Sequence, residues 1–94
     1  MAQIIKASGE TMDISPANGT DFQLEELYKH LDCNTVEFVY DYANGKILII
    51  DEEGKFTDKE YNYKATRYCH NNRMIHPLDK IVGDAILCDD NQIK

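Results

Sequence analysis

The sequence predicts an α+β domain in which a mainly antiparallel sheet carries two packed helices, with the elements in the order β-β-α-β-β-α-β. Two observations predict this class. Apolar and polar side chains alternate before Asn44-Gly45 and a short apolar run follows it, and apolar residues recur at helical spacing from Leu24 to Leu31. With 94 residues, no internal repeat and no linker, the chain is expected to form a single small domain over residues 1–94.

The first third of the chain predicts a hairpin followed by a helix. Residues 2–7 are rich in β-branched side chains, Ser8-Gly9-Glu10 marks a turn, and residues 11–15 return as a second strand. Thr20 and Gln23 have the spacing of a capping box, so the helix is expected to begin at Thr20. Its apolar stripe consists of Leu24, Leu27, Tyr28 and Leu31.

The middle of the chain predicts a second hairpin. Asn44-Gly45 tolerates the positive φ angles of a two-residue type I′ turn, which sets Tyr42 opposite Ile47, Tyr40 opposite Ile49 and Val39 opposite Ile50. Large apolar groups then occupy both faces of the hairpin. We favour the interpretation that both faces are covered within one molecule, and contact with a second copy is the alternative.

The last third predicts a second helix and a final strand. Between Glu60 and His70 a weaker helical stripe is formed by Tyr61, Ala65, Tyr68 and Cys69. Residues 80–88 have the composition of a strand, and Gly83 inside it indicates a bulge or the close approach of another backbone.

Charge and cysteine content narrow the class of protein. The formal net charge of -7 argues against direct nucleic-acid binding, which usually requires a basic surface. No apolar run approaches the roughly 20 residues of a membrane span, and the first residues lack the plan of a signal peptide, so we expect a cytoplasmic protein that does not contact membranes. Three cysteines, an odd number, indicate reduced thiols.

The sequence predicts neither a metal nor an organic cofactor. Cys69, His70, His76 and Cys88 are zinc-ligand types, but adjacent Cys69 and His70 would point to different sides of a helix. Phosphate-binding loops, nucleophile elbows and metal-binding helix motifs are absent from the sequence. A catalytic site would require carboxylates such as Asp51, Glu52 and Asp84 to converge in one cleft.

Two segments are candidate binding surfaces. Residues 61–68 combine aromatic, amide, hydroxyl and cationic groups, and we select Asn62, Tyr63, Thr66 and Arg67 as candidate ligand- or partner-binding residues. The alternative is that this segment is an ordinary helix with a buried stripe and a polar edge. Asn18, at the predicted start of the first helix, is a further candidate because free backbone N–H groups there could hold an anion, although Thr20 could simply cap the helix.

Five stretches, taken in order, resemble the domain-of-unknown-function 3846 family. They are residues 4–6, residues 16–27 with Asn18-Gly19, residues 51–55, Asn62 with Lys64-Ala65-Thr66, and residues 79–85 with Gly83-Asp84. The chain departs from the family pattern at Asp32-Cys33-Asn34, where glycines are expected, and at Asp58-Lys59-Glu60-Tyr61, where a Leu-Pro pair is common. The resemblance implies a small protein of bacteria, phages or mobile elements, and it implies no catalytic residues.

The main hypothesis is therefore a non-catalytic accessory protein of a phage or mobile element that binds a host protein or a small ligand. The alternatives are an acidic nucleic-acid mimic that inhibits a DNA-binding protein and a small carboxylate-dependent enzyme. A homo-oligomer is expected if the hairpin between Val36 and Asp51, or the edge of the last strand, is left uncovered.

Overall fold

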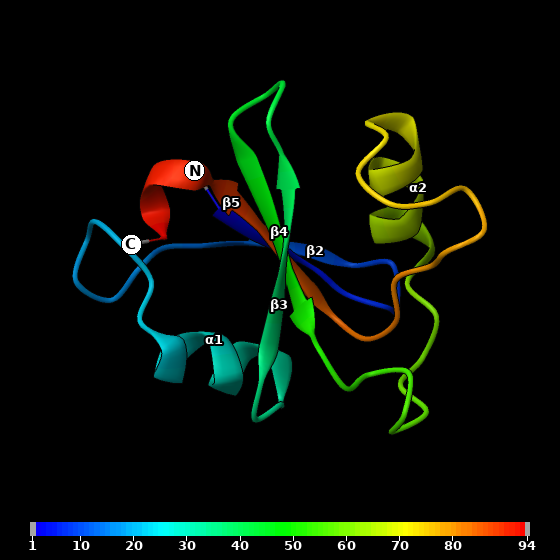
Figure 1. Cartoon of the computed structure of the whole chain (residues 1–94). Coiled ribbons are helices and arrows are strands. Elements are labelled where there is room, and N and C mark those ends of the chain that lie inside the picture. The colour runs from blue at the N-terminus through cyan, green and yellow to red at the C-terminus, as the bar shows by residue number, and fades with distance from the viewer. Residues whose placement is uncertain (1, 94) are drawn as a thin grey trace.

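The computed structural model describes residues 2–93, which form a five-stranded antiparallel sheet and two α-helices (Figure 1). The strands lie in the order β2-β1-β5-β4-β3, so the last strand is central and β2 and β3 form the two edges. This confirms the predicted α+β class and element order. The elements are β1 (Ala2–Ile5), β2 (Thr11–Ile14), α1 (Leu24–Leu31), β3 (Val36–Asp41), β4 (Lys46–Asp51), α2 (Tyr63–Asn71), β5 (Ala85–Asp89) and a final 3₁₀ turn, η1 (Asp90–Gln92).

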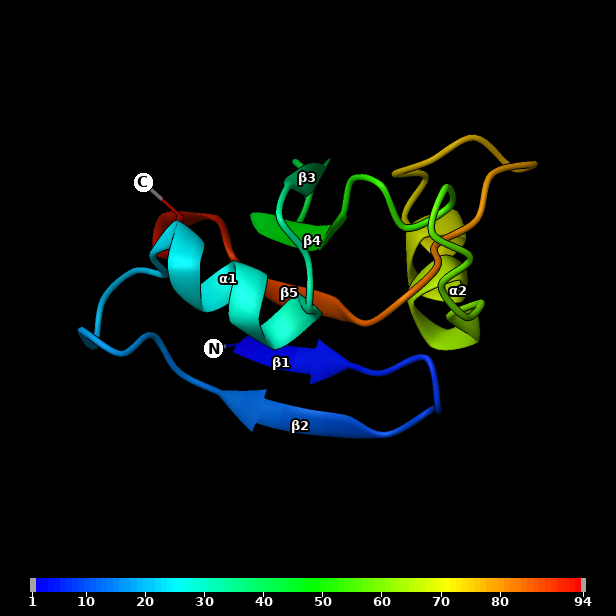
Figure 2. The ribbon, with the colours of Figure 1, turned by 90° about the horizontal axis from the view of Figure 1, so that it is seen from below.

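The two helices lie at opposite ends of the strongly twisted sheet and cover different faces (Figures 1 and 2). Successive residues of β4 point to opposite faces, so Ile47 and Ile49 join Leu27 and Leu31 of α1 in one apolar cluster. Leu48 and Ile50 instead join a second cluster with Ala65 and Cys69 of α2, among others. Both faces of β4 are therefore covered within one molecule, because β4 lies inside the sheet, whereas the predicted coverage does not extend to Tyr40 of β3, which is 44% exposed.

The predicted register of the second hairpin is wrong by two residues. Tyr40 lies opposite Ile47, and the loop contains the four residues 42–45 rather than two. The cause is the Asp41 carboxylate, which accepts hydrogen bonds from the backbone N–H and the Nδ2 of Asn44 at 3.3 and 2.8 Å. These bonds close the loop at Asp41 and leave Tyr42 outside the ladder with 86% of its surface exposed.

The first helix begins later than the sequence indicated. Its capping box joins Gln23 and Glu26, and not Thr20 and Gln23. Thr20 is occupied elsewhere, since its backbone N–H and its hydroxyl both donate to Asn18 Oδ1, at 2.9 and 3.2 Å. Asn18 thereby holds residues 18–21 in a turn that cannot continue into the helix.

The second helix and the final strand also begin later than expected. Tyr61 lies before α2, in an isolated bridge with Val82, and is 46% exposed rather than part of a buried stripe. Residues 80–84 precede β5 and run beside α2, because Gly83 has a φ of +77° and redirects the chain. A Cβ at Gly83 would lie 2.9 Å from Lys59 Cδ, so the group that approaches this glycine is a side chain and not the backbone that the sequence indicated.

Strand β5 offers no free edge to a second copy. It pairs with β1 on one side and with β4 on the other, so an oligomer through the edge of the last strand is ruled out. A hairpin of adjacent strands was expected at the N-terminus and is present, but β5 inserts beside β1 and moves the free edges to β2 and β3. None of the described helices is long and apolar enough to cross a membrane.

Ellman's reagent is expected to titrate one thiol in the native protein and three after unfolding. Cys69 and Cys88 are fully buried in opposite clusters, and burial raises the pKa of Cys69 to about 12 and that of Cys88 to about 11. Only Cys33 is partly exposed. A Cys33→Ser variant should abolish the native reaction, and release of three equivalents from the folded wild type would contradict this packing.

Candidate binding groove

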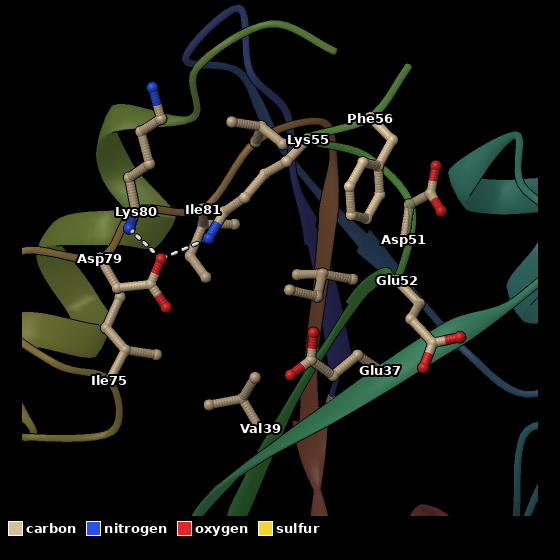
Figure 3. Close-up of a pocket in the computed structure, with 12 residues that line it drawn as sticks. Glu37, Val39, Asp51, Glu52, Lys55, Phe56, Ile75, Asp79, Lys80 and Ile81 are labelled. Carbon is tan, nitrogen blue, oxygen red and sulfur yellow. Dashed lines mark hydrogen bonds and ion pairs between the residues drawn. The ribbon is translucent and has the colours of Figure 1, made fainter. Parts of the chain in front are cut away.

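A groove of 310 Å³ lies between the β3–β4 hairpin and residues 75–82 (Figure 3). We call it the hairpin groove. Its floor is apolar and consists of Val39, Ile50, Ile75, Ile81 and Val82. Val39 and Ile50 are there because β3 and β4 point alternate residues to the α2 side of the sheet. Ile81 and Val82 are there because residues 80–84 run beside α2.

Negative charge predominates where the groove opens to solvent. The exposed carboxylates of Glu37 and Glu52 lie on the hairpin side, and neither makes a hydrogen bond or an ion pair with any of residues 2–93. On the opposite side, the Lys55 ammonium is paired with the Asp79 carboxylate (Figure 3), and this pairing lowers the pKa of Asp79. Lys80 points away from the groove in the same view.

An exposed aromatic ring stands at one end of the groove. Phe56 is 87% exposed, although it belongs to a loop that is otherwise polar. The loop is fixed by a short series of backbone hydrogen bonds, including those from the Phe56 and Thr57 N–H groups to Glu53 O at 3.0 and 3.1 Å. A solvent-exposed phenylalanine on an ordered turn beside an apolar groove is a feature typical of protein contact surfaces.

The four candidates of residues 61–68 divide into two buried and two exposed side chains. Asn62 is fully buried and caps α2, and its Nδ2 donates to Ile5 O and Gly83 O at 2.8 and 2.9 Å. The Thr66 hydroxyl accepts from the Ile81 N–H at 2.8 Å. Both side chains therefore hold residues 81–83 against α2 and have no surface to offer a partner.

Tyr63 and Arg67 are the two exposed candidates. They lie one turn apart on the outer side of α2, and Arg67 Nη1 donates to the Tyr63 hydroxyl at 3.3 Å. Tyr63 also makes an edge contact with Tyr61, with ring centroids 6.5 Å apart. These side chains form an exposed strip beside the bridge at Val82, outside the hairpin groove.

Asn18 lies apart from the other candidates. Its loop is at the α1 end of the molecule, whereas α2 is at the opposite end (Figures 1 and 2). The Asn18 Oδ1 atom accepts from the N–H groups of Thr20 and Asp21 at 2.9 and 3.0 Å. The backbone donors that were expected to hold an anion are thus bound by the Asn18 side chain itself.

The three carboxylates considered for catalysis do not meet in one cleft. Asp51 and Glu52 line the hairpin groove, whereas Asp84 lines a separate depression and accepts from the Ala7 N–H at 3.0 Å. Asp51 is buried and paired with the Lys59 ammonium at 2.9 Å. Among residues 2–93, no group of three or more histidine, cysteine or carboxylate side chains is arranged to hold a metal.

A buried carboxylate ties the hairpin loop to α2. Asp41 is 3% exposed and accepts from the Tyr68 hydroxyl at 3.0 Å as well as from Asn44. The hydrogen bonds from Asn44 hold the pKa of Asp41 below its usual value despite burial. The pKa of Tyr68 is raised to about 12, mainly by burial and secondly by the hydrogen bond to Asp41. This pair therefore keeps its charge state near neutral pH and acts as a structural link.

The hairpin groove itself was missed by the sequence reasoning. Its floor comes from three separate segments, and no local pattern brings Val39, Ile50 and Ile81 together. One signal was present: Phe56 is an isolated aromatic residue in a polar stretch, where a core role is improbable.

These features define a small α+β domain built on an antiparallel sheet with one helix on each face and an open, acidic-rimmed groove at one hairpin. Over residues 3–93 the chain matches the family described as a domain of unknown function, DUF3846, and it belongs to that family. Comparison with curated proteins and with solved structures gave no match.

The residues that carry the family resemblance have structural roles in this molecule. Asn62 and Thr66 fasten α2 to residues 81–83, and Asp84 fastens the turn after β1. Gly54 is buried where a Cβ would lie 3.1 Å from Val82 Cγ2. In this molecule Asn62, Thr66, Asp84 and Gly54 therefore contribute contacts that determine the fold.

Proposed function

We propose that this member of the family is a cytoplasmic accessory protein of a phage or mobile element that acts by binding a host protein at the hairpin groove. The observation that carries the proposal is the combination of an apolar floor, the unpaired carboxylates of Glu37 and Glu52, and the exposed ring of Phe56.

The chemistry of the groove favours a particular kind of partner segment. An apolar side chain placed against Val39, Ile50 and Ile81 would lose contact with water, while a neighbouring Lys or Arg could pair with Glu37 or Glu52. Phe56 would supply an aromatic anchor at the edge of the contact. The expected partner thus presents an apolar residue flanked by positive charge.

The pKa values of Asp79, Asp41, Cys69 and Tyr68 are all shifted away from neutral pH. The pKa of Asp79 is lowered by Lys55, and that of Asp41 by Asn44, so both carboxylates remain ionised near neutral pH. The raised pKa values of Cys69 and Tyr68 keep these groups protonated. A general acid, base or nucleophile requires a shift toward neutral pH, and these shifts are in the opposite direction.

Replacement of Phe56 by alanine is expected to weaken partner capture by about tenfold or more while leaving the melting temperature unchanged, because the ring is exposed and only the complex buries it. The measurement is quantitative mass spectrometry of proteins retained from host lysate by wild type and variant. Tyr42→Ala is the matched control, since Tyr42 is equally exposed at 86% but lies in the hairpin loop, outside the groove.

The same preparation separates a protein partner from a small ligand. A host protein that is lost with Phe56→Ala and retained with Tyr42→Ala supports the proposal. If native mass spectrometry instead shows a small bound molecule, and no host protein is retained, the binding partner is a small ligand and not a protein. If both variants capture the host protein as well as the wild type does, the partner does not bind at the hairpin groove.

A further inference from the structure

We infer that β3 pairs with β3 of a second copy, antiparallel and with Phe38 on the two-fold axis, so that two molecules share one continuous sheet. The inference does not rest on the proposed function, although Glu37 and Val39 contribute both to the hairpin groove and to the inferred strand pair. It begins from the position of β3, which is the last strand in the order β2-β1-β5-β4-β3 and pairs only with β4 among residues 2–93.

The β3 edge carries two acidic residues, Glu37 and Asp41, but it lacks the other features that protect most sheet edges. Its six residues pair with β4 in an unbroken register, with no bulge, and contain no proline, glycine or lysine. The other edge strand, β2, has only four residues. A long and regular edge of this kind is a template for another strand.

The backbone groups available for pairing follow from the β3–β4 ladder. The Glu52 N–H donates to Thr35 O at 3.2 Å, and hydrogen-bonded pairs alternate along an antiparallel ladder. Glu37, Val39 and Asp41 therefore bond toward β4, and Val36, Phe38 and Tyr40 direct their N–H and C=O groups to the open edge. A second β3 must bond to these three residues.

Only two registers pair these outward-directed residues along most of the strand, and charge distinguishes them. If Phe38 lies opposite Phe38 of the second copy, Val36 lies opposite Tyr40 and Glu37 lies opposite Val39. If Phe38 lies opposite Tyr40, Glu37 lies opposite Asp41 twice, and directly opposed like charges destabilise a strand pair. The first register avoids this repulsion, so the strand is complementary to itself in one register.

The side chains on the α1 side of the sheet favour the same register. Val36 and Phe38 are only partly buried against the apolar cluster, and Tyr40 is 44% exposed and stacked on Tyr42. In the chosen register Phe38 contacts Phe38 of the second copy, and each Tyr40 contacts a Val36. Aromatic and β-branched pairs of this kind stabilise neighbouring strands.

Sedimentation equilibrium between about 1 and 100 µM tests the association. The wild type is expected to be a dimer, and Tyr40→Pro a monomer with wild-type circular dichroism, because proline removes an outward N–H that β4 does not use. Asp13→Pro is the matched control: Asp13 is exposed on the opposite edge strand, β2, and should leave the dimer intact. A monomeric wild type at 100 µM would overturn the inference.

Disulfide trapping tests the register and does not depend on the proline variant. In a Cys33→Ser background, the double variant Glu37→Cys/Val39→Cys should form dimers on non-reducing gels after mild oxidation, because residues 37 and 39 face each other across the two-fold axis as a non-hydrogen-bonded pair. Val39→Cys alone crosslinks only in the rejected register, and Glu37→Cys alone only in a shorter one. Efficient crosslinking of either single variant would contradict the assigned pairing.

Discussion

The Asn62→Asp variant is expected to lose about 4 kcal/mol or more of its unfolding free energy at pH 7. The substitution preserves shape but turns the donor Nδ2 into an oxygen that faces Ile5 O and Gly83 O in a fully buried site. An ionised carboxylate there is so unfavourable that the group must be protonated, and protonating an ordinary Asp at pH 7 costs about 4 kcal/mol. A 94-residue domain has only about 5–14 kcal/mol of stability in total.

The pH dependence of this variant gives the decisive measurement. The folded-state pKa of Asp at position 62 would be raised above its unfolded value, so the variant gains stability as pH falls, by about 1.4 kcal/mol per unit from pH 7 toward pH 5. The wild type should be flat over this range. Its lowered pKa values at Asp41, Asp79 and Asp89 give stability that is present above about pH 4 and is lost only as pH falls through the folded-state values.

Urea titrations at pH 7 and pH 5 would measure both quantities. Asn71→Asp is the matched control, because Asn71 lies on the same helix but is exposed, and its change should stay below about 1 kcal/mol with no recovery at pH 5. If Asn62→Asp behaves like this control, the Asn62 side chain does not hold the start of α2 against Ile5 and Gly83.

The Lys59→Met variant is expected to lose about 2–4 kcal/mol of unfolding free energy. The Lys59 ammonium donates to Leu31 O and Asp32 O, each at 2.8 Å, and pairs with Asp51 at 2.9 Å. It thereby closes the C-terminal end of α1 and neutralises a carboxylate that is 8% exposed. Methionine keeps the length of the side chain but leaves that carboxylate without its cation, which is costly in a buried site.

Lys55 is the control for Lys59, because it also forms an ion pair but is much more exposed to solvent. Lys55 pairs with Asp79, but these side chains are 52% and 43% exposed, so Lys55→Met should cost less than about 1 kcal/mol. In the double variant Lys59→Met/Asp51→Asn, part of the loss should return because the unpaired charge is removed. Equal melting temperatures for Lys59→Met and Lys55→Met would show that the Lys59 contacts contribute little.

Lys59 also connects the two segments, residues 32–34 and 58–61, in which the sequence indicated a departure from the family pattern. Asp32 belongs to one of these segments and Lys59 to the other, and the Lys59 ammonium joins them through Asp32 O. Asp32 adopts a φ of 50°, a conformation that glycine takes more easily. A side chain at position 59 that binds this carbonyl offers one physical reason why a non-glycine residue is tolerated at position 32.

Much of the fold could be predicted from the sequence because the relevant signals are local. The apolar stripe from Leu24 to Leu31 and the alternation from Val36 to Tyr42 depend on side-chain periodicity, which does not change when the details of a turn are predicted wrongly. The exact boundaries could not be predicted, because side chains compete for the same backbone groups. Asn18 displaced the capping box by three residues, and Asp41 displaced the hairpin register by two.

The candidate site was only partly predictable for a different reason. The composition of residues 61–68 identified polar and aromatic groups, but composition does not show which side of a helix faces the sheet. In the tertiary structure Asn62 and Thr66 are buried and hydrogen-bonded to residues 81–83, whereas Tyr63 and Arg67 are exposed. Asn62 and Thr66 also belong to one of the stretches on which the family resemblance was based, and in this molecule both have structural roles.

The sequence by itself determined the α+β class, the order of the elements and the family, because these follow from periodicity, turn residues and short motifs read along the chain. Only the tertiary structure decided that β5 lies between β1 and β4, that β3 is left with an open edge, and that Val39, Ile50 and Ile81 meet beneath Glu37 and Phe56. Strand order and grooves depend on contacts between residues far apart in the chain, and no local pattern specifies such contacts.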